Sequence, residues 1–326
     1  MTESGRWLDE SLAQLAAMEV GLCQWDAPLA GRTTWKIGGP ARLLIEPETT
    51  EQFARIRQFV VQRSLPCCVI GRGSNLLIGD EGVDGVVVCL GSRMAGVRWD
   101  GPRVTVQAGV SVPRLALQAY QRGLSGLEHT AGIPGAIGGL IAMNGGSERQ
   151  EIGSAVRWVR VVDRDGQILR MAPEACDFAY RTSVFQRMAA WVMEAELELQ
   201  AGDPQQIGRT MREILASRRR KFPRRAPSCG SVFLNDPVIY ERFGPPGKVV
   251  EDTGCKGWRQ GDVEVSRMHA NFMVNTGQAR AADVLALIDR VRQAVFQRTG
   301  LWMRCEVRYV QPDGALVPAH VAAEAI

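Results

Sequence analysis

The sequence predicts an α+β protein built from more than one domain. The chain has 326 residues, and domains usually hold about 100–200 residues, which favours two or three of them. Hydrophobic residues make up 45% and charged residues 23% of the chain, as in ordinary globular proteins. Helical and strand periodicities are mixed in the first third, and short strands dominate the middle. Whole-chain disorder, a collagen and a continuous coiled coil are therefore excluded.

Local patterns predict the individual elements. Leu8, Leu12, Leu15 and Met18 recur at helical spacing, which indicates a short amphipathic helix near the N-terminus. The further expected helices share apolar residues three and four positions apart and cover 50–64, 112–122, 206–221 and 281–299. The expected strands are short and apolar and cover 42–46, 67–70, 86–90, 104–107, 156–163, 192–199 and 301–310. Asp165-Gly166 is a hairpin signal. In the last helix the apolar residues at 284, 288, 291 and 295 predict a core stripe, and Gly300 is placed to cap it.

Composition also limits where the protein works. No apolar run approaches the roughly 18 residues of a membrane span, and the first residues do not form a signal peptide. The 8 cysteines contain no C-x-x-C pair, so we expect reduced thiols and a cytoplasmic location. The 3 histidines are widely spaced, and we expect no metal site.

Basic charge is concentrated in one segment. The net charge is 39 − 35 = +4. Residues 209–225 hold eight basic residues and one acid, Glu213, so this segment carries +7 and the rest about −3. A solvated helix face and a grip on a phosphorylated small ligand both fit this pattern. Nucleic-acid binding is not expected, because no aromatic residues interleave with the charges.

Two glycine-rich segments are candidate cofactor loops. In the first, Gly71-Arg72-Gly73-Ser74-Asn75 follows an apolar strand, and glycines let backbone amides approach a phosphate. Leu76 breaks the G-x-G-x-x-G pattern, and a tight turn between a strand and a helix is the alternative. In the second, residues 131–146 hold six glycines in sixteen residues, which fits a backbone-rich wall against a large cofactor. Close packing of a helix on a sheet is the alternative there.

Three further segments carry polar groups that by themselves indicate little. Tyr180-Arg181 has the composition of a surface turn. Ser231 lies among small residues after the basic segment, without the G-x-S-x-G context of a hydrolase nucleophile, so its hydroxyl could act as a proton donor or belong to a turn. On the last expected strand, alternation places Trp302, Arg304, Glu306 and Arg308 on one face, where a surface ion pair is the simplest interpretation.

Taken together, these segments resemble the UDP-N-acetylenolpyruvoylglucosamine reductase family. The resemblance runs from about Thr33 to about Tyr309 and includes the blocks 33–40, 123–128, 247–251 and 269–275 in the family's order. The short stretch between Arg181 and Ser231 resembles the family's second type, which lacks an inserted tyrosine-bearing loop. Two blocks depart from the family's usual pattern, at 144–150 and at 261–266, where Glu264 stands at a position that is usually glutamine.

This resemblance implies an FAD-binding portion of the vanillyl-alcohol-oxidase (PCMH) type and a C-terminal α+β substrate-binding domain. The implied limits are 1–92 and 93–202 for two flavin subdomains, 203–311 for the substrate domain and 312–326 for a tail. The implied activity is NADPH-dependent reduction of the enolpyruvyl group of UDP-N-acetylglucosamine enolpyruvate, with hydride from FAD N5. The alternatives are an FAD oxidoreductase of the same fold with another substrate, or a non-catalytic nucleotide-binding homologue.

The resemblance also assigns roles to residues. Ser231 matches the family's proton donor, Arg181 the arginine that stabilises charge on the substrate, and Glu306 the active-site glutamate. The implied cofactor contacts are Gly71, Arg72, Gly73, Ser74, Asn75, Ala131, Gly132, Ile133, Pro134, Gly135, Gly138 and Gly139. Asn235 matches an asparagine near the substrate, and we expect Tyr180, Lys221 and Arg224 to contact the substrate as well.

Overall fold

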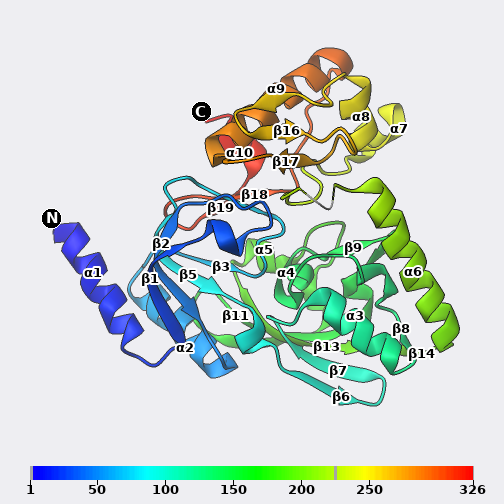
Figure 1. Ribbon diagram of the computed structural model, residues 1–326. Helices are drawn as coiled ribbons and strands as arrows, with labels where there is room; N and C mark the ends of the chain where they lie inside the picture. Colours follow the sequence, from blue (N-terminus) through cyan, green and yellow to red (C-terminus); the bar gives the residue numbers. More distant parts are fainter. Residues whose placement is uncertain (1–2, 224–225, 326) are drawn as a thin grey trace. The chain divides into compact units, whose positions relative to one another are not determined.

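The computed structural model describes residues 3–223 and 226–325 (Figure 1). They form two compact units, each assembled from segments that are distant in sequence. The first unit combines Leu43–Arg72 and Gly85–Arg218 with the N-terminal residues up to Trp25. The second combines Asp26–Arg42 and Gly73–Asp84 with the residues from Arg219 onward. Both units contain helices and strands, which confirms the predicted α+β class.

The first unit is centred on a five-stranded antiparallel sheet in the order β12-β11-β13-β7-β6. Its strands are β6 (Val97–Asp100), β7 (Arg103–Gln107), β11 (Val156–Val162), β12 (Ile168–Met171) and β13 (Trp191–Glu198). Val159, Val161, Ala195 and Leu197 are fully buried, because alternate residues of a strand point to the same face. The predicted turn joins β11 to β12, where Asp163 Oδ1 accepts hydrogen bonds from the backbone N–H of Asp165 and Gln167.

A second sheet has the strand order β1-β2-β5-β3. The chain passes from one unit to the other within β1, β2 and β5. Its strands are β1 (Leu22–Pro28), β2 (Pro40–Glu46), β3 (Cys67–Ile70) and β5 (Val83–Cys89), and β3 runs parallel to β5. Helix α2 (Thr50–Gln62) begins at Thr49, whose side chain caps it by accepting from Gln52 N. Helix α1 (Glu3–Ala16) buries Leu8, Leu12 and Leu15 as predicted, and Met18 lies just beyond its end.

The second unit is organised around α9 (Ala281–Thr299). Val284, Ile288, Val291 and Val295 have no exposed surface, which confirms the predicted core stripe. Gly300 caps the helix with φ of +72°. At the other end, the Asp80 carboxylate accepts from the backbone N–H of residues 281 and 282, at 2.7 Å and 3.1 Å. The side chain therefore supplies the partners that the first turn of a helix lacks.

Shorter elements complete both units. The remaining helices are α3 (Val112–Gln121), α4 (Ile137–Ala142), α5 (Val184–Arg187), α6 (Pro204–Lys221), α7 (Pro237–Phe243), α8 (Pro246–Asp252) and α10 (Ala319–Ala323). The remaining strands are β4 (Leu76–Ile78), β8 (Leu124–Ser125), β9 (Gly146–Ser147), β10 (Gln150–Glu151), β14 (Gln200–Ala201), β15 (Arg259–Gln260), β16 (Val263–Val265), β17 (Met273–Asn275), β18 (Arg308–Val310) and β19 (Leu316–Pro318). None of the helices in the described ranges is long and apolar enough to cross a bilayer.

The predicted strand at 301–310 is wrong in extent, because only β18 is regular. Met303, Cys305 and Val307 are buried as the alternation predicted, but Cys305 forms only an isolated bridge and the chain bends at 306 and 307. Their backbone groups bond to loops and to a side chain rather than to one continuous neighbouring strand. The tail expected at 312–326 contains β19 and α10. The boundaries proposed at 92, 202 and 311 stay predictions.

Candidate active site

The first predicted cofactor loop requires glycine at one position. Gly73 has φ of +58°, and a Cβ added there would lie 2.5 Å from the Arg32 backbone oxygen. The Gly73 carbonyl accepts from the backbone N–H of Thr34 at 3.3 Å and from its hydroxyl at 3.4 Å. The loop is therefore clamped against the turn at 32–34, and any side chain at position 73 would push the two apart.

The second predicted loop approaches the first within the first unit. A Cβ at Gly71 would lie 3.1 Å from the Ala136 Cβ. The segment is attached to the end of β7, because Gly138 N donates to the Ala108 carbonyl at 2.8 Å. Gly138 itself is a packing glycine, since its Cβ would meet the Ala108 Cβ at 2.8 Å, whereas Gly139 is exposed and opens onto free space. The close-packing interpretation therefore holds at Gly138, and the cofactor contacts of the segment stay a prediction.

The remaining loop residues fit a large phosphorylated cofactor. A Cβ at Gly132 would fall 2.3 Å from the Arg218 Cδ, so the stem of this arginine lies directly on the loop. Arg218 is thus the basic residue that the structure brings to the predicted flavin loops. Gly71, Ser74 and Gly132 are half-buried, and Arg72 and Pro134 are exposed. Narrow backbone walls with a nearby guanidinium suit the pyrophosphate of a dinucleotide such as FAD.

Arg181 lies at the tip of a tight turn in the first unit. Ala179 and Thr182 exchange two backbone hydrogen bonds, at 3.1 Å and 3.0 Å, around Tyr180-Arg181. Arg181 has φ of +54°, a left-handed conformation that costs a non-glycine residue about 1–2 kcal/mol. Its Nη2 donates to the Gly146 carbonyl at 2.9 Å. Strain of this kind is commonly retained where a side chain must be aimed.

Asn144, which the sequence analysis left without a role, connects this turn to the second cofactor loop. Its side chain is 1% exposed and donates to the Ala179 carbonyl at 3.0 Å and to Glu151 Oε2 at 2.8 Å. Its Oδ1 accepts from Gly153 N at 3.0 Å. Residues 144–150, the first block that departs from the family's usual pattern, therefore lead into an ordered hairpin of β9 and β10 that this asparagine anchors.

In the second unit, backbone pairing joins the segment that follows Ser231 to the segment that carries Glu306. Glu306 N donates to the Val232 carbonyl at 2.8 Å, and Leu234 N donates to the Arg304 carbonyl at 2.9 Å. Ser231 directly precedes Val232, so the two predicted catalytic residues lie on paired antiparallel segments. Asn75 contacts the segment that carries Glu306, because its Nδ2 donates to the Glu306 carbonyl at 3.1 Å. This predicted cofactor residue thus also holds the glutamate-bearing segment.

Asn271 is a buried residue that supports the Ser231 segment and to which sequence reasoning assigned no role. It is 5% exposed, its Oδ1 accepts from Phe233 N at 2.9 Å, and its Nδ2 donates to the Phe233 carbonyl at 3.0 Å. Its own carbonyl accepts from Val232 N at 2.8 Å. One residue therefore fixes the backbone that follows Ser231. The available signal was its place in the block 269–275, which matches the family.

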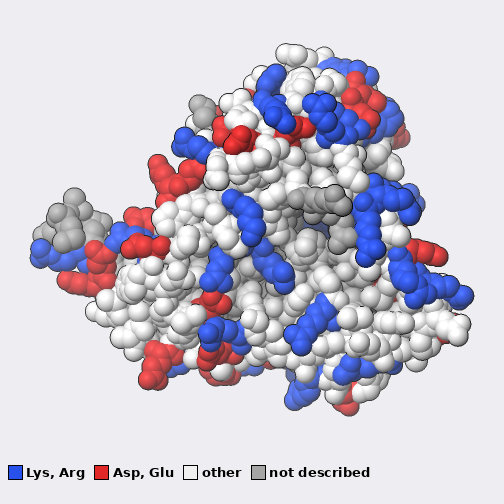
Figure 2. Space-filling model, viewed as in Figure 1, with Lys and Arg blue, Asp and Glu red and all other residues white. Residues whose placement is uncertain are grey.

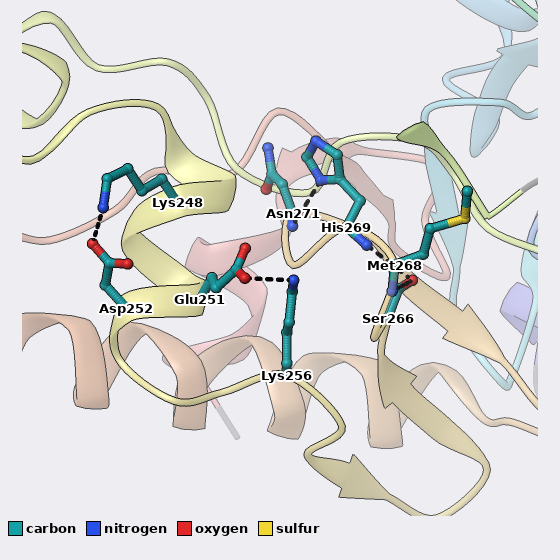
Figure 3. Close-up of polar contacts among 8 residues, drawn as sticks. All are labelled: Lys248, Glu251, Asp252, Lys256, Ser266, Met268, His269 and Asn271. Carbon is teal, nitrogen blue, oxygen red and sulfur yellow. Dashed lines mark hydrogen bonds and ion pairs between the residues drawn. The ribbon is translucent and has the colours of Figure 1, made fainter. Parts of the chain in front are cut away.

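The loop that presents Asn271 is itself held by side chains (Figure 3). Ser266 Oγ accepts from Met268 N at 3.2 Å and from His269 N at 3.4 Å. His269 Nδ1 accepts from Asn271 N at 3.2 Å, which requires an unprotonated ring nitrogen. Burial, and then the Lys256 charge, lower the pKa of His269 and keep that nitrogen free of a proton.

Residues 261–266, the second block that departs from the family's usual pattern, place a buried charge on β16. Glu264 is 7% exposed and pairs with Arg259 Nε at 2.6 Å and with Arg267 Nε at 3.2 Å. Two guanidinium groups therefore compensate the carboxylate that replaces the family's usual glutamine. The hairpin of β15 and β16 remains regular around it.

Two cysteines flank the paired segments without offering a competing acid or nucleophile. Burial, and then the Glu306 carboxylate, raise the pKa of the Cys229 thiol well above its ordinary value. Burial raises the pKa of Cys305 to about 12. Both groups are therefore neutral thiols at physiological pH, and a buried neutral thiol is chemically inert.

The predicted substrate contacts are mostly at the surface. Tyr180, Lys221 and Asn235 are exposed, and Arg224 lies outside the described residues. Figure 2 shows Lys and Arg side chains gathered along α6, where Lys221 is the last helical residue. Arg304 pairs with Asp236 at 3.1 Å, an ion pair that sequence reasoning did not anticipate.

Comparison with known proteins shows the family to which the chain belongs. An FAD binding domain matches residues 41–172, and the C-terminal domain of UDP-N-acetylenolpyruvoylglucosamine reductase matches residues 222–310. The chain is 42% identical to UDP-N-acetylenolpyruvoylglucosamine reductase 1 of Corynebacterium glutamicum over 290 residues, which cover 89% of this chain and 87% of that protein. It is 43% identical to the enzyme of Heliobacterium modesticaldum over 296 residues, with coverages of 90% and 93%.

A solved structure extends the similarity to three dimensions. The crystal structure of the reductase from Thermus caldophilus aligns with a TM-score of 0.74 and 34% identity, covering 88% of this chain and 98% of that one. A chain with this FAD-binding domain and these relatives is a flavin-dependent oxidoreductase. More particularly, it belongs to the UDP-N-acetylenolpyruvoylglucosamine reductase family, as the sequence motifs predicted. Its membership of the second type stays a prediction.

Proposed function

We propose that this protein reduces the enolpyruvyl ether of UDP-N-acetylglucosamine enolpyruvate to UDP-N-acetylmuramate, with NADPH as the electron donor. The observation that carries the proposal is the pairing of the Ser231 segment with the Glu306 segment through Val232. A general flavin oxidase has no need of a dedicated proton donor such as Ser231. The free cysteines and the family's role in peptidoglycan precursor synthesis support a cytoplasmic location.

When bound, FAD supplies the hydride that the terminal vinyl carbon takes up. Negative charge then develops on the carboxylate side of the substrate, and Arg181 stabilises it more in the transition state than in the ground state. Glu306 helps to hold this geometry. The Ser231 hydroxyl donates a proton to the neighbouring carbon, a contribution of about 10²–10⁴-fold. Lys221 and Arg224 attract the diphosphate of either ligand.

The decisive experiment is anaerobic NADPH consumption by the purified protein, with and without the enolpyruvyl substrate. Stoichiometric consumption that requires the substrate is the expected result. A protein that contains flavin but whose NADPH consumption does not depend on the substrate would instead be a flavoenzyme for another compound. A colourless protein that stays inactive after FAD is added would be a nucleotide-binding homologue.

Ser231→Ala tests the proposed donor within this scheme. We expect NADPH to reduce the flavin of the variant at the wild-type rate, while the enolpyruvyl substrate no longer reoxidises it. The two half-reactions are followed separately by stopped-flow absorbance of the flavin. Wild-type turnover by the variant would show that another group supplies the proton.

A further inference from the structure

The Glu306 segment is held from two opposite directions by neighbouring residues of the second unit. Glu306 N donates toward the Ser231 segment, at the Val232 carbonyl. The preceding N–H, that of Cys305, donates to His320 Nδ1 at 3.1 Å. The following carbonyl, that of Val307, accepts from Ala319 N at 2.9 Å. The Glu306 N–H therefore bonds to the segment that follows Ser231, whereas the Cys305 N–H and the Val307 carbonyl bond to the C-terminal segment 316–324.

The C-terminal segment is anchored firmly enough to serve as a support. Ala319, Ala322 and Ala323 of α10 are buried in the same core as α9. Arg292 of α9 is 3% exposed and links the segment to the glutamate-bearing one. Its Nε donates to the Met303 carbonyl at 2.9 Å, and its Nη2 pairs with Glu324 at 2.8 Å. The C-terminal segment thus bonds directly to the backbone of residues 305 and 307, and through Arg292 to the backbone of residue 303.

His320 must keep Nδ1 unprotonated to accept from the Cys305 N–H. The charged groups around it are Arg292 of α9, Glu324 after α10, and Arg304 and Arg308 on either side of Glu306. Burial comes first and Arg292 second among the causes that lower the pKa of His320, and Glu324 opposes them. The imidazole is therefore neutral at physiological pH, with its proton assigned to Nε2 by the hydrogen bond it accepts.

We propose that the C-terminal segment 316–324 positions Glu306 for catalysis and that His320 is the positioning residue at this contact. The inference rests on the proposed function, in which Glu306 belongs to the active site. His320 does not reach the reacting atoms; it acts through the Cys305 backbone. A displaced carboxylate loses catalytic power steeply, because a misplacement of about 1 Å can cost about 10²-fold in rate.

Two variants with similarly branched side chains test the hydrogen bond between His320 and the Cys305 N–H. His320→Asn keeps an acceptor where Nδ1 stands, whereas His320→Leu removes it with similar volume. We expect the leucine variant to reoxidise its flavin with the enolpyruvyl substrate about tenfold or more slowly, and the asparagine variant to recover most of this loss. Flavin reduction by NADPH is the internal control and stays unchanged in both. Equal rates of reoxidation in the wild type and the leucine variant would overturn the proposal.

A double-mutant cycle separates positioning from general damage. In a Glu306→Gln background, adding His320→Leu has no further effect on reoxidation if His320 acts through Glu306. An equal slowing in both backgrounds would overturn the proposal. Amide hydrogen exchange of residues 305–307 gives a readout without any substrate, and the leucine variant should exchange faster than the asparagine variant. Should the wild type fail to use the enolpyruvyl substrate, the exchange result still decides whether the support exists.

The contact also predicts a pH profile. The wild-type reoxidation rate should fall as the pH drops through the lowered pKa of His320, because protonated Nδ1 cannot accept from Cys305. The asparagine variant should lack this acid limb. A limb that persists unchanged in that variant would assign the titration to another group and overturn the role of the imidazole.

Discussion

Replacing Asn271 with leucine removes the side-chain clamp behind Ser231 while keeping the volume of the residue. The change strips partners from the Phe233 N–H and carbonyl, and Phe233 is 1% exposed. A buried backbone group left without a partner costs about 1–3 kcal/mol. Two such groups predict a loss of about 2–6 kcal/mol in the free energy of unfolding, with little cavity contribution.

The assay is urea unfolding followed by fluorescence, for the wild type, Asn271→Leu and a matched control. Asn235→Leu is that control, because Asn235 is an exposed asparagine on the same segment, and such surface changes usually stay within about 0.5 kcal/mol. A loss below about 1 kcal/mol in Asn271→Leu would refute the reasoning, because the Phe233 groups would then have found other partners.

Three further predictions follow from the described contacts. Gly73→Ala should yield protein that retains little FAD, measured by flavin absorbance after purification, because its Cβ would lie 2.5 Å from the Arg32 oxygen; full flavin content would contradict the tight loop. His129 is 2% exposed, and neither ring nitrogen has a hydrogen-bond partner in the described ranges, so His129→Leu should stabilise the protein by about 1–3 kcal/mol in urea unfolding. Burial lowers the pKa of His129, so the unfolded state takes up a proton first as the pH falls. The free energy of unfolding should therefore decrease below about pH 6.5, and less steeply in His129→Leu than in the wild type. A destabilised His129→Leu would mean that the imidazole has a hydrogen-bond partner. Arg181→Lys should keep its flavin and slow reoxidation by the substrate about 10²-fold, since lysine lacks the planar fork; loss of flavin instead would indicate a structural role.

The hydrophobic pattern was sufficient to predict the long helices α1, α2, α3, α6 and α9 and the strands β2, β3, β5, β7, β11 and β13, but not the shorter elements between them. The stripe at 284, 288, 291 and 295 and the cap at Gly300 needed only local periodicity, and both are present in α9. The strand expected at 301–310 shows the limit of the method. Alternation predicts an extended chain with one buried face. Whether that chain becomes a regular strand depends on the backbone groups that lie opposite it. Here these groups belong to residues 232, 234 and 319, which do not form one continuous strand.

The motifs predicted the family and the chemical types at the site, because glycine loops, an arginine turn, a serine and a glutamate are written locally in the chain. Tertiary structure decided which of these groups share a support. Asn75 bonds to the Glu306 carbonyl, Asn271 to Phe233, and Asn144 to the turn that carries Arg181. Such contacts join residues far apart in sequence, and one asparagine looks like another until its buried partner is known. The sequence by itself therefore determined the family of this protein, and only the folded chain determined what holds each predicted catalytic residue in place.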